Sequence, residues 1–200
     1  NKQIVAALVG AAGMTGAAFF PAQKLKKAAV PLFIASVVLL GLVFVPGLGI
    51  ENYGAKRWIG VGGFSFQPSE IAKFAFVILA SAYMAKHPAD MKKFRGILAV
   101  AAMGVTVCLL VIAEPNMSIT MCVALVMVAM MFIGGAKIGH LAMCLLPLAV
   151  AVPLLIAVEP YRMARLMAYL DPWASPKGEG YQLIQSFYAL GSGGWFGVGL

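Results

Sequence analysis

Six long apolar segments follow one another along the chain, and they restrict its fold more than any other feature. Each is close to the roughly 20 residues that an α-helix needs to cross a bilayer. They cover residues of about 3–20, 28–49, 69–86, 96–113, 117–135 and 139–158. Because lipid offers the backbone no hydrogen-bond partner and the runs do not alternate, helices are expected. The sequence therefore predicts an all-α fold, a polytopic membrane helix bundle with about six transmembrane helices over residues 1–158.

The composition excludes a water-soluble protein. Hydrophobic residues make up 62% of the chain and charged residues 11%, whereas a soluble domain usually carries about 25% charged residues. No nucleotide-binding loop, zinc signature or Ser-His-Asp pattern is present, so we expect no ATP hydrolysis, no metal-binding motif and no nucleic-acid partner. Cys108, Cys122 and Cys144 lie within apolar segments and are interpreted as packing residues.

The loops between the segments alternate in charge. Lysine and arginine gather in loops 21–27, 86–95 and 134–140, and the positive-inside rule predicts that these loops are cytoplasmic. The loops of opposite parity, 50–68, 114–117 and 159–200, are then outside. We expect a multi-pass protein of the bacterial cytoplasmic membrane.

The positive-inside rule does not account for the cations in the loops that we expect outside. They are Lys56, Arg57, Arg162, Arg165 and Lys177. One interpretation is ordinary solvated loop charge, or side chains that snorkel to the interface. The other is a site that holds an anion at the outer surface, because the planar fork of arginine suits phosphate. Trp58, Trp173 and Trp195 fall on the same side, where an interfacial aromatic belt would place them.

A polar group begins the segment 69–86. Pro68 can occupy the first turn of a helix, where a missing N–H is harmless, and Glu70 then falls where the helix dipole favours a carboxylate. Lys73 follows three residues later, so both side chains project from one face. They form either a cap with a local ion pair or one wall of a cavity, since ionisable groups within spans usually face a cavity.

A second acid, Glu114, ends the segment 96–113. Pro115 follows it and disfavours helical geometry at the residue before. We expect the outer end of that helix to present Glu114, Asn116 and Ser118. Together with Glu70 and Lys73, these residues would form a polar pocket that opens outward, if the two helices touch.

The outer segment 159–200 is predicted to contain amphipathic helices. In "EPYRMARLMAYLDPW", Arg162 and Arg165 share one helical face, which is typical of a helix in the membrane interface. A second amphipathic helix carries Gln182, Gln185 and Ser186. The chain stops at Leu200 without a closing helix, so we expect it to be a fragment, with this segment incomplete.

Three motifs resemble one protein family. "GAKRWIGVGGFSFQPSEIAK", "EPNMSIT" and "LDPWASPKGEGYQLIQSFYALGSGGWFGVGL" are similar to the SEDS proteins (shape, elongation, division and sporulation), which include RodA, FtsW and SpoVE. The wording of the third motif leans toward the FtsW and SpoVE branch. The resemblance covers nearly the whole chain. It implies a fold of roughly ten transmembrane helices, from which this chain lacks the first helix and the C-terminal part.

The resemblance also implies an activity. Family members are glycosyltransferases that polymerise peptidoglycan glycan strands from lipid II, a disaccharide-pentapeptide on undecaprenyl pyrophosphate. They act in cell division or cell shape, with a class B penicillin-binding protein as transpeptidase and with other divisome proteins. A divalent cation, Mg or Mn, is a cofactor candidate that the sequence does not show. The alternatives are a flippase or transporter for lipid-linked precursors and a non-catalytic division scaffold.

Two departures from the family pattern limit the assignment of a catalytic residue. Asn116 stands where the family often has aspartate, and it cannot serve as a carboxylate. The family's catalytic aspartate lies beyond Leu200, so Asp171 is not assigned that role and this fragment alone is expected to be inactive. The candidate substrate-binding residues are Arg57, Trp58, Glu70, Lys73, Glu114, Arg162, Arg165, Gln182, Gln185 and Ser186.

Overall fold

The structure, a computed structural model, describes residues 2–52, 55–61, 64–158 and 160–199, and its helices follow the predicted segments. The predicted outer segments 50–68 and 159–200 thus include residues 53–54, 62–63, 159 and 200, which lie outside the described residues. The long helices are α1 (Lys2–Ala18), α2 (Ala22–Leu42), α3 (Pro68–Lys86), α4 (Phe94–Ala113), α5 (Met117–Ile133) and α6 (Ile138–Val158). The chain divides into two compact units, Asn1–Ala142 and Met143–Leu200. The division into a membrane bundle up to residue 158 and an outer loop from 159 stays a prediction.

Helix lengths agree with a membrane protein. Among the described residues, four helices are long and apolar enough to cross a bilayer, namely α2, α3, α4 and α6, and the apolar helices α1 and α5 are somewhat shorter. The largest difference in helix bounds concerns α2, which begins at Ala22, within the predicted loop 21–27, and ends at Leu42 although the apolar run continues to about residue 49. Gly47, with φ of +89°, adopts a backbone conformation that turns the chain and that glycine accepts without a steric cost.

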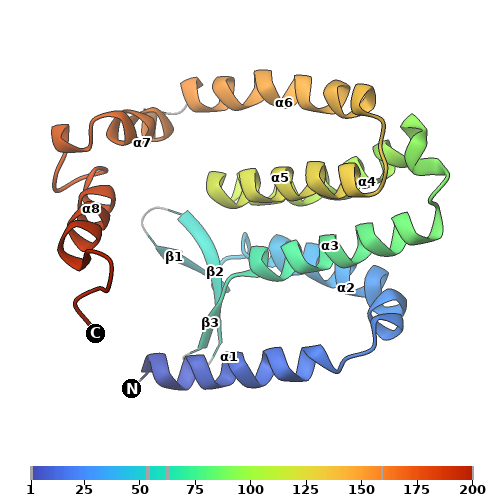
Figure 1. Ribbon diagram of the computed structural model, residues 1–200, viewed down its shortest axis with the longest axis horizontal. Helices are drawn as coiled ribbons and strands as arrows, with labels where there is room; N and C mark the ends of the chain where they lie inside the picture. The colour runs from blue at the N-terminus through green and yellow to red at the C-terminus, as the bar shows by residue number, and fades with distance from the viewer. Residues whose placement is uncertain (1, 53–54, 62–63, 159, 200) are drawn as a thin grey trace. The chain divides into compact units, whose positions relative to one another are not determined.

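A small antiparallel sheet interrupts the helices. Strands β1 (Gly49–Asn52), β2 (Ala55–Val61) and β3 (Phe64–Phe66) follow in sequence order. Ile59 in the middle strand pairs with Gly49 on one side and with Phe66 on the other. Only Gln67 separates β3 from α3, so the sheet fixes where α3 begins. This sheet lies at one end of the helices of the first unit (Figure 1), which we call the sheet end.

Four helices form the core of the first unit. Helix α2 packs on α3, α3 packs on α4 and α5, and α4 packs on α5, as their neighbouring ribbons show (Figure 1). On α3 the buried face carries the alanines Ala72, Ala75 and Ala80 beside Phe76, and small side chains let helices approach closely in a membrane. On α4 the buried stripe is Ile97, Val100, Gly104, Val107 and Val111, at the three- and four-residue spacing of one helical face.

Replacing Gly96 with alanine tests this packing at the start of α4. A Cβ at Gly96 would meet main-chain atoms of Asp90 and Met91, which belong to the 3₁₀ turn η1 (Asp90–Lys92). Main chain cannot yield as a flexible side chain can, so Gly96→Ala is expected to cost about 1–3 kcal/mol of stability. Thermal unfolding in detergent micelles measures the loss. The control is Gly139→Ala on α6, where nothing lies within 4 Å of the added carbon, and an equal loss there would contradict the steric explanation.

The second unit contains most of α6 and two shorter helices. Helix α7 (Pro160–Leu170) and helix α8 (Tyr181–Gly193) are joined through the 3₁₀ turn η2 (Pro172–Ala174). Both helices occur where the sequence predicted amphipathic helices. Trp173 in η2 and Tyr188 in α8 meet edge to face, with ring centroids 6.0 Å apart, so the turn and α8 pack against each other.

Candidate functional site: an ion pair beside an apolar pocket

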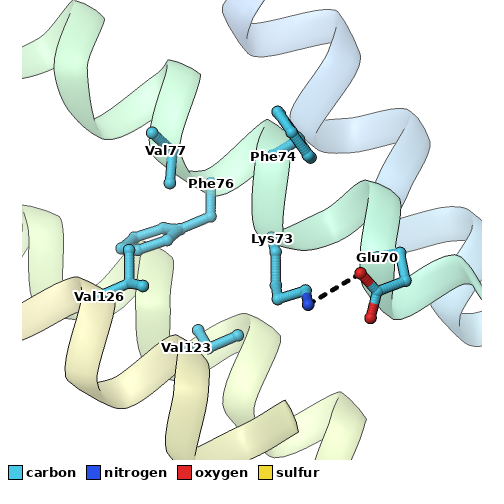
Figure 2. A pocket seen from close by; sticks show the side chains of 7 residues that line it. All are labelled: Glu70, Lys73, Phe74, Phe76, Val77, Val123 and Val126. Carbon is cyan, nitrogen blue, oxygen red and sulfur yellow. Dashed lines mark ion pairs between the residues drawn. The ribbon is translucent and has the colours of Figure 1, made fainter. Parts of the chain in front are cut away.

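A pocket of about 240 Å³ opens between α3 and α5 in the first unit. Phe74, Phe76 and Val77 from α3 and Val123 and Val126 from α5 supply its apolar lining, and the polar residues that line it are Glu70 and Lys73. Figure 2 shows the Lys73 side chain reaching back toward Glu70, with Phe76 and Val126 close together deeper along the helices. The pocket therefore combines a hydrocarbon surface with one charged group at its end.

The charged group is an ion pair within one helix. Lys73 Nζ lies 2.8 Å from Glu70 Oε2, and the Lys73 side chain is 25% exposed against 53% for Glu70. Helix α3 starts at Pro68 and places Glu70 in its first turn, so the predicted helix start is confirmed. The sequence left two interpretations open, a local pair or a cavity wall, and the geometry contains both features. The lysine is the better shielded partner, and both charges line the pocket.

Glu114 and Arg57 come together at the sheet end, on the turn between α4 and α5. Arg57 Nε donates to the Glu114 main-chain oxygen at 3.2 Å, and Arg57 Nη2 donates to the Pro115 oxygen at 2.5 Å. The Glu114 side chain is buried, with 1% of the residue exposed, and its carboxylate oxygens have no hydrogen-bond partner among the described residues. Burial raises the pKa of the Glu114 carboxyl to about 7, while the charge of Arg57 acts in the opposite direction. Glu114 is thus enclosed by the protein. It does not line the pocket described above, whose residues all come from α3 and α5.

Other predicted residues occupy the same end of the first unit. Asn116, just before α5, is buried at 7% exposure, and its main-chain oxygen accepts the Thr120 hydroxyl hydrogen bond at 3.0 Å. Trp58 is half-buried on β2, where it pairs with Ile50 of β1. The burial of Asn116 agrees with a structural role for this residue.

The remaining candidates belong to the second unit, and each is described within that unit alone. Arg165 Nε donates to Glu179 Oε2 at 3.2 Å, which connects α7 to the segment before α8, and Arg162 lies one turn earlier on α7. On α8, Ser186 Oγ donates to the Leu183 oxygen at 2.7 Å. Gln182 and Gln185 are exposed. A role of these residues in substrate binding stays a prediction.

The apolar lining of the pocket was not among the predicted site residues. Phe76 is fully buried and Val123 is 1% exposed, as packing residues of a helical core are. The sequence alone does not distinguish them from such packing residues. A weak signal was available on α3, since Phe76 follows Lys73 by three residues and projects from the same face. No comparable signal marks Val123 or Val126 on α5.

Comparisons with known proteins agree with this architecture. The sequence model of the FtsW/RodA/SpoVE family, described as cell cycle protein, matches residues 1–200. A probable peptidoglycan glycosyltransferase FtsW of Geobacter sp. (strain M18) is 38% identical over 100% of this chain and 55% of its own length. The corresponding protein of Thioalkalivibrio sulfidiphilus is 40% identical over 81% of this chain and 41% of its own length. The chain spans about half the length of the curated relatives it matches.

Comparison with solved structures also finds proteins of peptidoglycan synthesis and rod shape. A chain from a peptidoglycan synthase complex, described as coordinating polymerization and crosslinking, is 31% identical with a TM-score of 0.76, covering 96% of this chain and 57% of that one. The rod shape determining protein RodA of Thermus thermophilus is 27% identical with a TM-score of 0.52, covering 66% of this chain and 43% of that one.

The apolar helices define a multi-pass helical membrane protein, and its apolar pocket ends at an ion pair. The match over the full chain then identifies it more closely. The chain belongs to the FtsW/RodA/SpoVE family of cell cycle proteins, and the resemblance found in the sequence motifs is confirmed.

Proposed function

We propose that the full-length protein is a glycosyltransferase that polymerises peptidoglycan glycan strands from lipid II. The observation that carries the proposal is the ion pair of Glu70 and Lys73 beside the apolar pocket between α3 and α5. A lipid pyrophosphate combines a dianionic head with a long hydrocarbon chain; the Lys73 ammonium would attract the head, and the apolar lining would contact the chain. The names of the relatives support the same activity.

The pocket would hold only part of such a substrate. Sites that enclose a drug-sized ligand measure roughly 300–1,000 Å³, and this pocket is smaller, at about 240 Å³. We propose that its phenylalanine and valine side chains contact the first part of the polyprenyl chain. The rest of the chain would lie in the surrounding lipid, where burial in the protein would bring no further hydrophobic gain.

Lys73 would act on the leaving group. When the acceptor hydroxyl attacks the anomeric carbon of the donor sugar, the bond to pyrophosphate breaks and negative charge develops on the leaving oxygen. A preorganised cation close to that oxygen stabilises the transition state more than the ground state. Glu70 would hold the Lys73 ammonium in place through their 2.8 Å contact. The base that accepts the hydroxyl proton is not assigned to a residue of this chain.

A divalent cation, Mg or Mn, stays part of the proposal without a site of its own. Within the described ranges, no three His, Cys, Asp or Glu side chains gather so that they could hold a metal ion. The described residues therefore supply no group of three such ligands, and no step of the proposed reaction passes through a metal ion.

We further propose that the sheet end of the first unit faces the outside of the cytoplasmic membrane. The support is the charge of the connection at the other end of α3, between α3 and α4, where Lys86, Lys92, Lys93 and Arg95 are all exposed. Basic loops of this kind stay in the cytoplasm. An outside position for residues 159–200 follows only from the parity of the predicted spans.

The partner of the polymerase would be a cross-linking enzyme, a class B penicillin-binding protein, with other divisome proteins. The solved complex that resembles this chain is described as coordinating polymerization and crosslinking, which supports such a pairing. A role in division is favoured by the FtsW relatives.

An assay with defined components tests the proposed activity. The purified full-length protein is incubated with lipid II, with and without Mg or Mn and without any other glycosyltransferase, and glycan strands are separated by size. We expect strand products. Translocation of lipid II across a bilayer without strands would identify a flippase instead, and neither activity would identify a scaffold; either result would refute the polymerase.

A further inference from the structure

Arg57 makes a contact that phosphate binding does not explain. From the middle strand β2, its guanidinium donates to two consecutive main-chain oxygens, those of Glu114 and Pro115, at 3.2 and 2.5 Å. The planar fork of arginine can make such a two-pronged contact, whereas a lysine ammonium is a single point of charge. The residues joined are 57 and 58 positions apart in sequence, so the contact connects separate elements of the first unit.

The acceptor oxygens lie just beyond the C-terminal end of α4, on its C-cap residue Glu114 and on Pro115. The last carbonyl groups of a helix have no partner within the helix, and the helix dipole favours a cation at this end. The last turn of α4 contains no basic residue of its own. Arg57 thus brings a positive charge from the sheet to this helix end and donates to two carbonyl groups of the turn that follows it.

The same contact joins the two walls of the pocket at their common end. On one side, β2 pairs with β3 through Ile59 and Phe66, and only Gln67 separates β3 from the helix that carries Glu70 and Lys73. On the other side, the turn held by Arg57 leads directly into α5 (Met117–Ile133), which supplies Val123 and Val126. A shift of the sheet relative to the turn would therefore move α3 relative to α5.

We propose that Arg57 is a positioning residue that clamps the sheet to the turn between α4 and α5 and so sets the spacing of the two pocket walls. In this role its hydrogen bonds to main chain matter more than its charge. The role replaces the direct phosphate contact that the sequence suggested for Arg57. The consequence for catalysis depends on the proposed function, but the clamp itself does not.

Hydrogen exchange tests the clamp without substrate. The full-length protein in lipid nanodiscs is compared with Arg57→Ala and Arg57→Lys, and exchange is followed for peptides covering residues 49–66 and 114–120. Loss of both charge-assisted hydrogen bonds is expected to speed exchange of these amides at least about tenfold in Arg57→Ala. Arg57→Lys keeps the charge but not the fork, and it is expected to be clearly faster than the wild type.

The matched control is Lys56→Ala, the neighbouring and exposed cation on the same strand, which should exchange like the wild type. Exchange in Arg57→Ala within about twofold of the wild type would overturn the clamp. So would a loss of protection of the same size in Lys56→Ala, because any loss of charge from the strand would then suffice.

Kinetics with lipid II separate positioning from direct contact. A positioning role predicts that Arg57→Lys loses most of the activity lost in Arg57→Ala, with kcat reduced in both. Near-normal kcat in Arg57→Lys, with a raised KM confined to Arg57→Ala, would overturn positioning in favour of a charge contact with the substrate. If the wild type makes no strands, the proposed function fails, and the exchange data still decide whether Arg57 is a clamp.

Discussion

Replacing Lys73 with methionine is expected to lower the rate of strand synthesis by the full-length protein at least about a hundredfold. Methionine has a similar length and apolar character, so it keeps the packing beside Val123 and removes only the charge. A preorganised group that stabilises developing charge in a shielded site is typically worth factors of about 10²–10³ in kcat. The measurement is the initial rate of strand formation from lipid II, with protein amount and thermal stability checked in parallel.

Two further variants define what that result would mean. Lys86→Met removes a cation from the opposite end of the same helix, where the side chain is exposed, and its rate should stay within about twofold of the wild type. Glu70→Gln removes the partner of Lys73 but leaves its charge, so a smaller loss than in Lys73→Met is expected. A rate close to normal in Lys73→Met would contradict the assignment of Lys73 to the leaving group.

The sequence predicted the helices well because lipid restricts the backbone so strongly. Where the apolar run and the helix differ, the reason is local, as in α2. There α2 ends at Leu42, a turn containing Pro46 and Gly47 follows, and the side chains stay apolar up to Ile50. Hydropathy measures side-chain transfer to lipid and does not record backbone geometry, so the prediction of the segment 28–49 extended past the end of the helix at Leu42.

The sheet was missed although its sequence carries a hairpin signal. "RWIGV" and "FSF" are rich in aromatic and β-branched residues, and the two residues Gly62 and Gly63 separate them. Two such runs joined by Gly-Gly are typical of a β-hairpin. The surrounding apolar segments favoured an interpretation of residues 50–68 as a simple loop.

The candidate site divides by the range of its contacts. The pair of Glu70 and Lys73 could be predicted because three residues of helix fix their geometry, whatever the rest of the chain does. The contact of Arg57 with the turn at Glu114 could not be predicted, since it depends on how a sheet docks on a distant helix end. For the same reason the enclosure of Glu114, at 1% exposure, could not be predicted from the sequence, which suggested a polar pocket that opens outward.

The second large effect expected is a loss of protein stability as the pH rises from about 5 to 7. Its source is the carboxyl group of Glu114. The pKa of its carboxyl is about 7 in the folded protein, raised by burial from an ordinary value of 4.5. Between these values the folded protein keeps a proton that the unfolded chain has lost, so each rise in pH favours unfolding. A difference of about 2.5 pKa units at 1.36 kcal/mol each gives an upper limit of about 3 kcal/mol. Thermal unfolding in detergent between pH 5 and 8.5 measures the slope.

Glu114→Gln isolates this contribution, because glutamine has the same shape and carries no charge at any pH. The variant is expected to lose the fall in stability between pH 5 and 7 and to exceed the wild type at pH 8 by up to about 3 kcal/mol. Glu51→Gln on β1, where the side chain is exposed, should retain the slope of the wild type. A slope in Glu114→Gln equal to that of the wild type would mean that Glu114 is already compensated when ionised. Arg57 is the cation placed to do so, and the double variant Arg57→Ala/Glu114→Gln would then show whether the two residues stabilise each other beyond the main-chain clamp.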